Sequence, residues 1–446
     1  MQNNFLIKVK HFINDKDLLT LWMNNFLVAY AFLLPISPSF RSTLFIDMVL
    51  LFLLRGNIKE NLRIAWQNPI IRSFVYLFGI YVIGLLWTDN LKHGLWAVKS
   101  IKYGLYLIIF YLIVDGRYIS KVLSAFILGM LFSEIISYGM LLGILPWQLD
   151  IEGVRIYTAY AIGDPSPFLH HIHYGVALAF VVLLLAQRII YSNSSKLIKI
   201  FMSLFILTAT ANIFVTGGRT GYLTFIALLL ILAFSYLKKY FFQLLIAIPL
   251  LFTIAYNTSP IFKEKVIQTE KSFSSLFDHK PDINTSIGQR AAIYYYGFDV
   301  FKNNPLLGVG SGDSMDEIKK LVPKEFIGIH AMPHEHNQFL STLISLGIVG
   351  LLIFLNVYYQ IFRYKQEDKE LRFIMIFSTL AITFGILTTQ FNLRFFMPLW
   401  VVMLAVSMIS KNRRTIKREI DDKRVFLEVS AIIIAISAIR FFKHFI

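Results

Sequence analysis

Arg219 stands at the end of a long apolar run, within Thr-Gly-Gly-Arg-Thr-Gly at residues 216–221. A guanidinium is planar and forked, so it can hold two oxygens of a phosphate at once, which a lysine ammonium cannot. The glycines leave room for a bulky anion, and the two threonines add hydroxyl donors. The segment therefore predicts a phosphate or pyrophosphate ligand, with an interfacial anchor as the alternative.

A second arginine, Arg290, lies near the start of a stretch, residues 286–301, in which apolar and aromatic residues recur at helical spacing. The free N–H groups and the positive dipole end of a helix start favour an anion. Arg290 is therefore a second candidate for binding a substrate phosphate. A solvated charge on an interfacial helix is the simpler alternative.

A histidine-rich segment, His-Ala-Met-Pro-His-Glu-His-Asn, occupies residues 330–337 just before an apolar run. An imidazole can take a proton from a sugar hydroxyl near neutral pH, so His336 is a candidate general base, with His334 and Asn337 assisting in substrate binding. Zinc is a weaker interpretation, because the i, i+4 histidine pair and cysteine ligands are missing. We therefore expect no metal or other cofactor; a helix-capping turn at Asn337 is the structural alternative.

Further polar residues, Arg155 and the three histidines at positions 170, 171 and 173, precede another apolar run. Arg155 is a further candidate for substrate binding. Ordinary loop polarity explains such residues equally well.

The elements that must position these residues are membrane-spanning helices. The chain is 56% hydrophobic and 16% charged, and its mean hydropathy is +0.62, which excludes a soluble protein. Crossing a bilayer takes about 20 mostly apolar residues. We expect an all-α bundle of about twelve spans, near residues 20–36, 41–54, 70–87, 97–114, 121–145, 168–188, 198–216, 220–237, 240–256, 338–361, 372–389 and 395–410. An additional apolar stretch, 425–442, is long enough to span or to lie along the interface.

The net charge of +16 comes from Lys and Arg that gather in alternate loops. The positive-inside rule places those loops and the N-terminus in the cytoplasm, so the excess charge reflects topology. Membrane lipids are expected partners, and no nucleic-acid partner is expected. No cleavage site follows the first apolar segment, which should remain as an anchor. The chain has no cysteine, which excludes disulfides and a thiol nucleophile.

This topology divides the chain into four parts. Spans one to nine occupy residues 1–256, a large periplasmic loop occupies 257–336, and spans ten to twelve occupy 337–410. Residues 411–446 form a basic cytoplasmic segment and the C-terminal apolar helix. The large loop begins polar and unpatterned at 257–284, then continues as amphipathic helices on the membrane surface. All the candidate residues face outward, whereas a channel or symporter would carry ionisable groups inside its spans.

The motifs around Arg219, Arg290 and His336, together with Asn-Pro-Leu-Leu-Gly-Val-Gly-Ser-Gly at 304–312, resemble the O-antigen ligase family in order and sidedness. The resemblance extends from about Arg155 to Leu352. It implies transfer of a glycan from undecaprenyl pyrophosphate to lipid A-core oligosaccharide, at the periplasmic face of the bacterial inner membrane, without metal.

In that resemblance Arg219 and Arg290 match positions that hold the donor pyrophosphate. His336 matches the general base that activates the acceptor hydroxyl for attack with inversion. Gln390, Asn392 and Arg394 stand where some relatives carry an acid. An O-antigen polymerase or an O-linked oligosaccharyltransferase would use the same donor. A lipid-linked oligosaccharide flippase is the alternative from a different class, and it should carry its cations along a cavity within the spans.

Overall fold

The computed structural model describes residues 12–151, 154–159, 163–236, 238–277, 283–391, 395–417 and 422–442. A helix or a pair of helices coincides with every one of the twelve expected spans. These are α2 Lys16–Leu33, α3 Pro38–Arg55, α5 Pro69–Ile83, α6 Leu91–Ile101 with α7 Tyr106–Ile113, α8 Ile119–Leu141, α9 His171–Tyr191, α10 Lys196–Val215, α11 Arg219–Ser235, α12 Phe241–Thr258, α17 Gln338–Arg363, α18 Lys369–Ile386 and α19 Phe396–Ser407.

Within the described ranges, seven segments are long and apolar enough to cross a bilayer. They are 69–87, 91–113, 116–141, 171–191, 196–215, 241–258 and 338–363. Helices α11 and α19 are apolar but shorter. The chain is therefore an α-helical, multi-pass membrane protein, and the count of twelve spans stays a prediction. The fourth expected span is not one continuous helix, because a 3₁₀ turn at Lys102–Leu105 separates α6 from α7.

The bundle is built around α19 and α9. Every residue of α19 is buried, and α9 packs against α10, α11 and α18. The contact between α9 and α11 is a backbone contact: a Cβ on Gly175 would lie 2.9 Å from the Cα of Gly221. Small residues allow helices to approach this closely in a membrane protein, so α11 is fixed against α9 at the turn that carries Arg219.

One element departs from the otherwise all-α chain that was expected. Strands β1 Gln148–Ile151 and β2 Val154–Thr158 form an antiparallel hairpin after α8. Alternating residues of β2 such as Val154, Ile156 and Thr158 suit an extended strand, but a hairpin this short gives little periodicity in the sequence.

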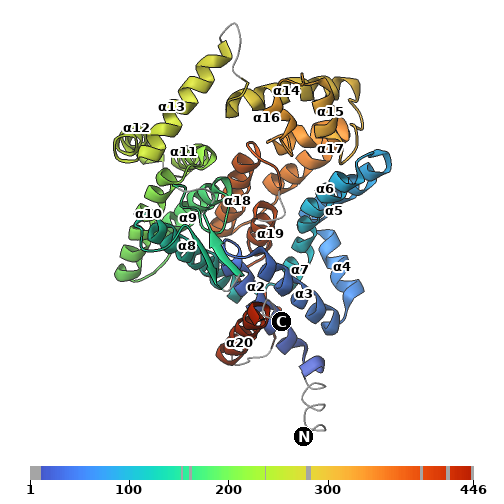
Figure 1. Cartoon of the computed structure of the whole chain (residues 1–446). Coiled ribbons are helices and arrows are strands. Elements are labelled where there is room, and N and C mark those ends of the chain that lie inside the picture. Colours follow the sequence, from blue (N-terminus) through green and yellow to red (C-terminus); the bar gives the residue numbers. More distant parts are fainter. Residues whose placement is uncertain are drawn as a thin grey trace.

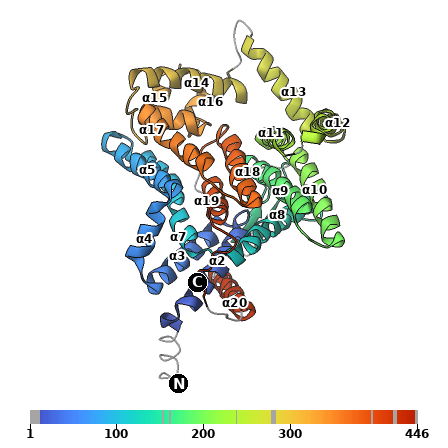
Figure 2. The same ribbon diagram turned by 180° about the vertical axis from the view of Figure 1, so that it is seen from behind.

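Four helices lie between α12 and α17, at one end of the molecule. They are α13 Pro260–Ser274, α14 Ser286–Asn303, α15 Ser314–Leu321 and α16 Ile327–His330. Figures 1 and 2 show α14, α15 and α16 gathered there, at the opposite end of the molecule from α20. We call this the loop end and the opposite one the terminal end.

The prediction of an unpatterned stretch at 257–284 was wrong, because most of it is α13. Ser259 caps that helix by accepting from the N–H of Phe262, and Pro260 occupies its first turn. Phe262 is buried against Phe214 and Tyr222, with ring centroids 5.1 and 5.0 Å apart. A single buried aromatic anchors this otherwise polar helix to the bundle.

Helix α14 begins and ends as expected, but its apolar face packs on protein. Ile293 and Val300 form a small core with α15 and α17 through Ile318 and Ile344. Tyr295 and Phe298 remain exposed on the outside. The loop end is therefore a packed subassembly attached to α17, which positions Arg290 more rigidly than a helix floating on lipid would.

The glycine-rich segment 304–312 joins this subassembly to α17. Gly347 interrupts α17 with φ +63°, and a Cβ there would meet the carbonyl oxygen of Leu306 at 2.2 Å. The N–H groups of Val309 and Gly310 donate to the carbonyls of Ile344 and Ser345, which the kink exposes. The glycines in this motif therefore serve docking of the loop onto a kinked helix.

Two further helices, α4 Ile58–Gln67 and α20 Asp422–Phe442, lie toward the terminal end. Helix α20 packs on α2, and the Asp422 carboxylate accepts hydrogen bonds from Tyr118, Lys121 and Asn25. It is outside the seven candidate spans of the described chain.

Candidate functional site

Arg219 is the first residue of α11, at the loop end of the bundle, and is half-buried. Its Nη2 donates to Oε1 of Gln268 on α13 over 3.3 Å. Lys265, one turn earlier on α13, donates to the same oxygen over 3.4 Å. Two cations thus share one neutral amide oxygen, which leaves most of their donor capacity available for an anion.

The glycines and threonines next to Arg219 have structural roles that the sequence did not reveal. A Cβ on Gly218 would lie 2.8 Å from the carbonyl oxygen of His171, and Thr216 donates its hydroxyl to the Ile213 carbonyl. The Thr220 hydroxyl pairs with that of Thr388 at 2.6 Å. These groups fix the start of α11 against α9 and the end of α18, and so aim the arginine.

Arg290 lies in the first turns of α14 and is half-buried. Burial lowers the pKa of its guanidinium; Tyr294 partly opposes this, and the charge of Arg219 lowers it further. The two arginines, 71 residues apart in the chain, are therefore close enough to repel each other. Two partly dehydrated guanidiniums whose charges interact attract an anion with more than one negative charge.

His336 has an unusual backbone. Its φ is +56°, and the only other non-glycine residue of the described chain with positive φ is Asn57. A left-handed conformation costs on the order of 1 kcal/mol for such a side chain, and observed strain of this kind clusters at functional sites. The N–H of His336 donates to Nδ1 of His334 over 3.2 Å, which stabilises the turn.

The His336 ring is held with one nitrogen engaged and one without a partner. The backbone of Thr388 accepts a hydrogen bond from the ring, while Nδ1 is buried and no described group bonds to it. Burial, with the charges of His334 and Arg290, lowers the pKa of His336 to about 3. At neutral pH the ring is therefore neutral and Nδ1 carries a lone pair.

Two other histidines belong to the same cluster. The rings of His334 and His336 lie 4.1 Å apart, and burial together with Arg290 lowers the pKa of His334 to about 4. His170, at the start of α9, has its pKa lowered to about 4 by burial, then by His171, with His334 contributing. The structure thus brings Arg219, Arg290, His334, His336 and His170 together.

Glu335 contacts groups outside this cluster. Its carboxyl is 1% exposed and accepts from Nε2 of Gln390, which also donates to Oγ of Ser341 over 2.7 Å. Burial raises the pKa of Glu335. Through Gln390 this buried carboxyl is tied to Ser341 of α17, and its role as an alternative base stays a prediction.

The remaining predicted residues have more ordinary environments. The Asn337 side chain caps α17 by accepting from the N–H groups of Phe339 and Leu340, so the structural interpretation of this residue holds, and a contact of its amide with substrate stays a prediction. Arg155 on β2 pairs with Asp150 at 3.2 Å and is 60% exposed. No contact of the described residues links Arg155 to the cluster. His330 contacts the carbonyl oxygen of Pro323 at 3.2 Å.

Three histidines approach one another, as ligands of a metal ion would. Among the described residues, no three His, Asp or Glu side chains are arranged to hold a metal ion. His171 instead pairs with Asp164 at 2.9 Å. The expectation of a metal-independent site stays a prediction.

Sequence analysis missed Lys265 and Gln268, which cover Arg219, and Thr388, which contacts both Arg219's helix and the His336 ring. The polar α13 segment offered no motif, and Thr388 is an ordinary residue at the end of an apolar run. Of the three residues compared with an acid in relatives, Gln390 contacts Glu335, and Asn392 and Arg394 lie outside the described residues.

Fold and site together define a multi-pass membrane protein that gathers two arginines and a strained, neutral histidine at one end of its helical bundle. Comparison with known families gives a match of residues 203–355 to the family model described as O-Antigen ligase. Residues 203–355 therefore carry a domain of the O-antigen ligase family, and over these residues the resemblance drawn from the motifs is confirmed. Arg219, Arg290 and His336 all fall within the matched residues.

Two curated proteins show more distant similarity. An uncharacterised protein of Haemophilus influenzae is 26% identical over 250 residues, which is 51% of this chain and 61% of that protein. The exopolysaccharide production protein ExoQ of Rhizobium meliloti is 26% identical over 110 residues, 23% of this chain and 25% of the relative. The chain thus spans less than two thirds of the length of either relative.

Proposed function

We propose that this protein is an inverting, metal-independent glycosyltransferase that moves a glycan from undecaprenyl pyrophosphate to lipid A-core oligosaccharide in lipopolysaccharide assembly. The active site faces the periplasm from the inner membrane. The observation that carries the proposal is the convergence of Arg219 and Arg290 with the neutral imidazole of His336. A diphosphate leaving group needs the cations, and an acceptor hydroxyl needs the base.

The residues divide the reaction between them. The acceptor hydroxyl oxygen attacks the anomeric carbon while the bond from that carbon to the pyrophosphate oxygen breaks on the opposite face. The hydroxyl proton passes to Nδ1 of His336, and the pyrophosphate leaves with the electron pair. Arg219 and Arg290 stabilise the charge that develops on the leaving oxygen, and Lys265 adds a third cation.

Donor binding also tunes the base. A pKa of about 3 makes free His336 a weak proton acceptor, since an effective base has a pKa nearer the working pH. The negative charge of a bound pyrophosphate offsets that of Arg290 and raises the pKa of His336. Because Nδ1 is shielded from solvent, the acceptor must displace covering groups to reach it.

A polymerase that joins repeat units on the same carrier is the second candidate, favoured by the similarity to a protein named for exopolysaccharide production. An O-linked oligosaccharyltransferase would differ only in its acceptor, and a flippase would transfer nothing.

Deletion of the gene followed by a lipopolysaccharide gel separates these functions. A ligase deletion should remove every capped chain, while a polymerase deletion leaves single-unit caps. Retention of the lipid-linked unit in the cytoplasm would indicate a flippase. Unchanged lipopolysaccharide with underglycosylated proteins would indicate the oligosaccharyltransferase.

A further inference from the structure

The terminal end holds a second cationic recess, far along the fold from Arg219. Its volume is about 870 Å³, and it lies between the start of α2, the end of α3, α4 and the segment 411–417. Five basic residues line it, against three acidic ones. The basic residues are Lys16, Arg55, Arg413, Arg414 and Lys417, and the acidic ones are Asp15, Asp17 and Glu60.

Arg55 and Arg413 are the most enclosed of these cations. Arg55 donates to the Thr20 hydroxyl over 3.3 Å, and the Arg413 guanidinium lies 4.9 Å above the ring of Tyr111. In the described chain neither forms an ion pair with a carboxylate. Burial lowers the pKa of both, and the charge of Arg413 lowers that of Arg55 further. Two neighbouring, half-dehydrated guanidiniums are stabilised by an anion between them.

Two of the three carboxylates that line the recess hold the backbone in place. Asp15 caps α2 by accepting from the N–H of Leu18, and Asp17 accepts from the N–H of Lys417 over 3.0 Å. Both contacts fix the walls of the recess.

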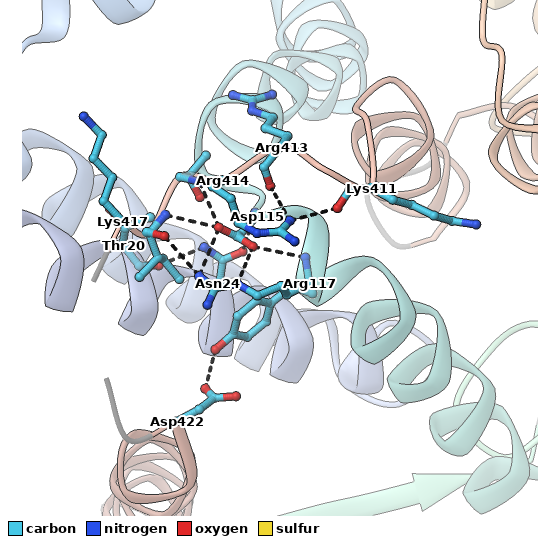
Figure 3. Close-up of polar contacts among 12 residues, drawn as sticks. Thr20, Asn24, Asp115, Arg117, Lys411, Arg413, Arg414, Lys417 and Asp422 are labelled. Atoms are coloured by element: carbon cyan, nitrogen blue, oxygen red, sulfur yellow. Dashed lines mark hydrogen bonds and ion pairs between the residues drawn. The ribbon is translucent and has the colours of Figure 1, made fainter. Parts of the chain in front are cut away.

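Asp115 builds the wall that carries Arg413. Its buried carboxylate accepts from the backbone N–H groups of Thr415 and Ile416, at 2.8 and 3.1 Å, and from Arg117. Gly116 donates its N–H to the Arg413 carbonyl over 2.9 Å. Figure 3 shows Asp115 at the centre of these contacts, with Arg413, Arg414 and Lys417 around it. The segment 411–417 is thus fastened in place, and the recess is preformed.

The apolar surface beside the recess indicates which kind of ligand it binds. Helix α4 exposes Leu62 and Trp66 beside polar residues, the pattern of a helix lying in the membrane interface. On α3, Leu50, Leu53 and Leu54 are about half exposed, directly before Arg55. A phosphate between Arg55 and Arg413 therefore has apolar surface for acyl chains beside it.

We propose that this recess binds the phosphodiester headgroup of an anionic phospholipid, held between Arg55 and Arg413, with its acyl chains along α3 and α4. Basic pockets between transmembrane helices are suited to such headgroups. The negative charge of the bound headgroup would link Arg413 of the C-terminal segment to Arg55 at the end of α3.

The test uses the full-length protein in phosphatidylcholine nanodiscs, with phosphatidylglycerol added stepwise and bound phosphatidylglycerol counted by native mass spectrometry. The double variant Arg55→Gln/Arg413→Gln should weaken binding at one site on the order of 10-fold or more, from the attraction of two surface-proximal charges. Lys196→Gln/Lys199→Gln is the matched control, because it removes the same charge at the start of α10, outside the recess. The control should retain the tight site.

Equal weakening in both variants would mean diffuse attraction and would overturn the proposal. Inorganic phosphate tests the soluble source: if millimolar phosphate displaces the lipid from the wild-type site, the recess recognises free anions and the lipid assignment is wrong. If the glutamine variant fails to fold, Arg55→Lys/Arg413→Lys replaces it. That variant keeps both charges but loses the forked grip of the two guanidiniums, so it should weaken the tight site while the Lys196→Gln/Lys199→Gln control does not; unchanged binding would contradict the proposal.

Discussion

Two polar centres of this molecule, around Asp115 at the terminal end and around His336 at the loop end, contrast in how their groups are satisfied. The Asp115 carboxylate accepts two hydrogen bonds from the Arg117 guanidinium and three from the backbone N–H groups of Arg117, Thr415 and Ile416. His336 has a left-handed backbone and a buried Nδ1 with no partner in the described chain. A saturated polar group stabilises a fold, whereas a strained and unsatisfied one is better explained by a substrate.

The sharpest test of this contrast is His336→Asn. Asparagine tolerates the left-handed conformation, so the free energy of unfolding should stay within about 1 kcal/mol of wild type. Transfer of glycan, measured with purified lipid-linked donor and acceptor, should fall by a factor on the order of 10²–10⁴. His330→Asn is the control and should keep most activity. An active His336→Asn protein, or activity abolished by excess chelator, would contradict the proposed base.

The second test concerns the forked grip of Arg219. Arg219→Lys should be nearly as damaging as Arg219→Ala, with losses on the order of 10²–10³ in transfer rate, because a point charge cannot bind a diphosphate bidentately. Arg155→Lys serves as comparison, since Arg155 pairs with Asp150 in the hairpin. Full activity of Arg219→Lys would make this arginine an anchor, and an equal loss in Arg155→Lys would bring the hairpin into the site.

At the saturated centre the expected effect falls on stability. Asp115→Asn should lower the free energy of unfolding by about 2–4 kcal/mol, because it leaves the Arg117 charge and two buried N–H groups poorly matched. Thermal unfolding in detergent measures this, and transfer per folded molecule should remain near wild type. If Asp115→Asn loses activity but keeps its stability, the Asp115 centre serves function and not the fold, contrary to the contrast drawn with His336.

The same carboxylate predicts a pH dependence. Burial alone would raise the pKa of Asp115, but the hydrogen bonds from Arg117, Ile416 and Thr415 together lower it to about 2. A folded pKa below the unfolded value of 3.8 gives stability that is present above pH 4 and lost as the pH falls toward 2. Asp115→Asn should remove that slope from the unfolding curves.

The smallest effect is expected from Arg290 on the base. Its charge lowers the pKa of His336 and of His334, so Arg290→Gln should raise both. The acidic limb of kcat/KM against pH should then move to higher pH, by roughly half a unit to one unit. If the acidic limb moves to lower pH or does not move, Arg290 does not lower the pKa of the catalytic histidine. Arg155→Gln should leave the limb in place.

Sequence reasoning located the helices and the chemical residues, because apolar length and residue type are local properties. It placed Arg219, Arg290 and His336 on one side without a structure. It assigned the glycines around Arg219 to substrate access, whereas Gly218 and Gly221 are required by the contact with α9. Such a contact joins residues that are distant in the sequence, and a single amino-acid sequence does not reveal it.

Two other errors have the same origin. Helix α13 was missed because its single buried aromatic, Phe262, gives no periodic pattern in a polar segment. The packing of helix α14 on α15 and α17 was missed because an apolar face looks alike whether it meets acyl chains or the side chains of Ile318 and Ile344. Only the tertiary partner distinguishes these cases.

The close crossing of Gly175 and Gly221 has a consequence for reading mutational scans of this protein. Any side chain at either position meets backbone of the other helix at less than 3 Å, and the cheapest relief is to slide α11, and Arg219 with it. Both positions should therefore reject even alanine, and they should score like active-site residues although neither has a functional group to offer. A variant of Gly175 or Gly221 that folds but is inactive would show how precisely Arg219 must be positioned for transfer.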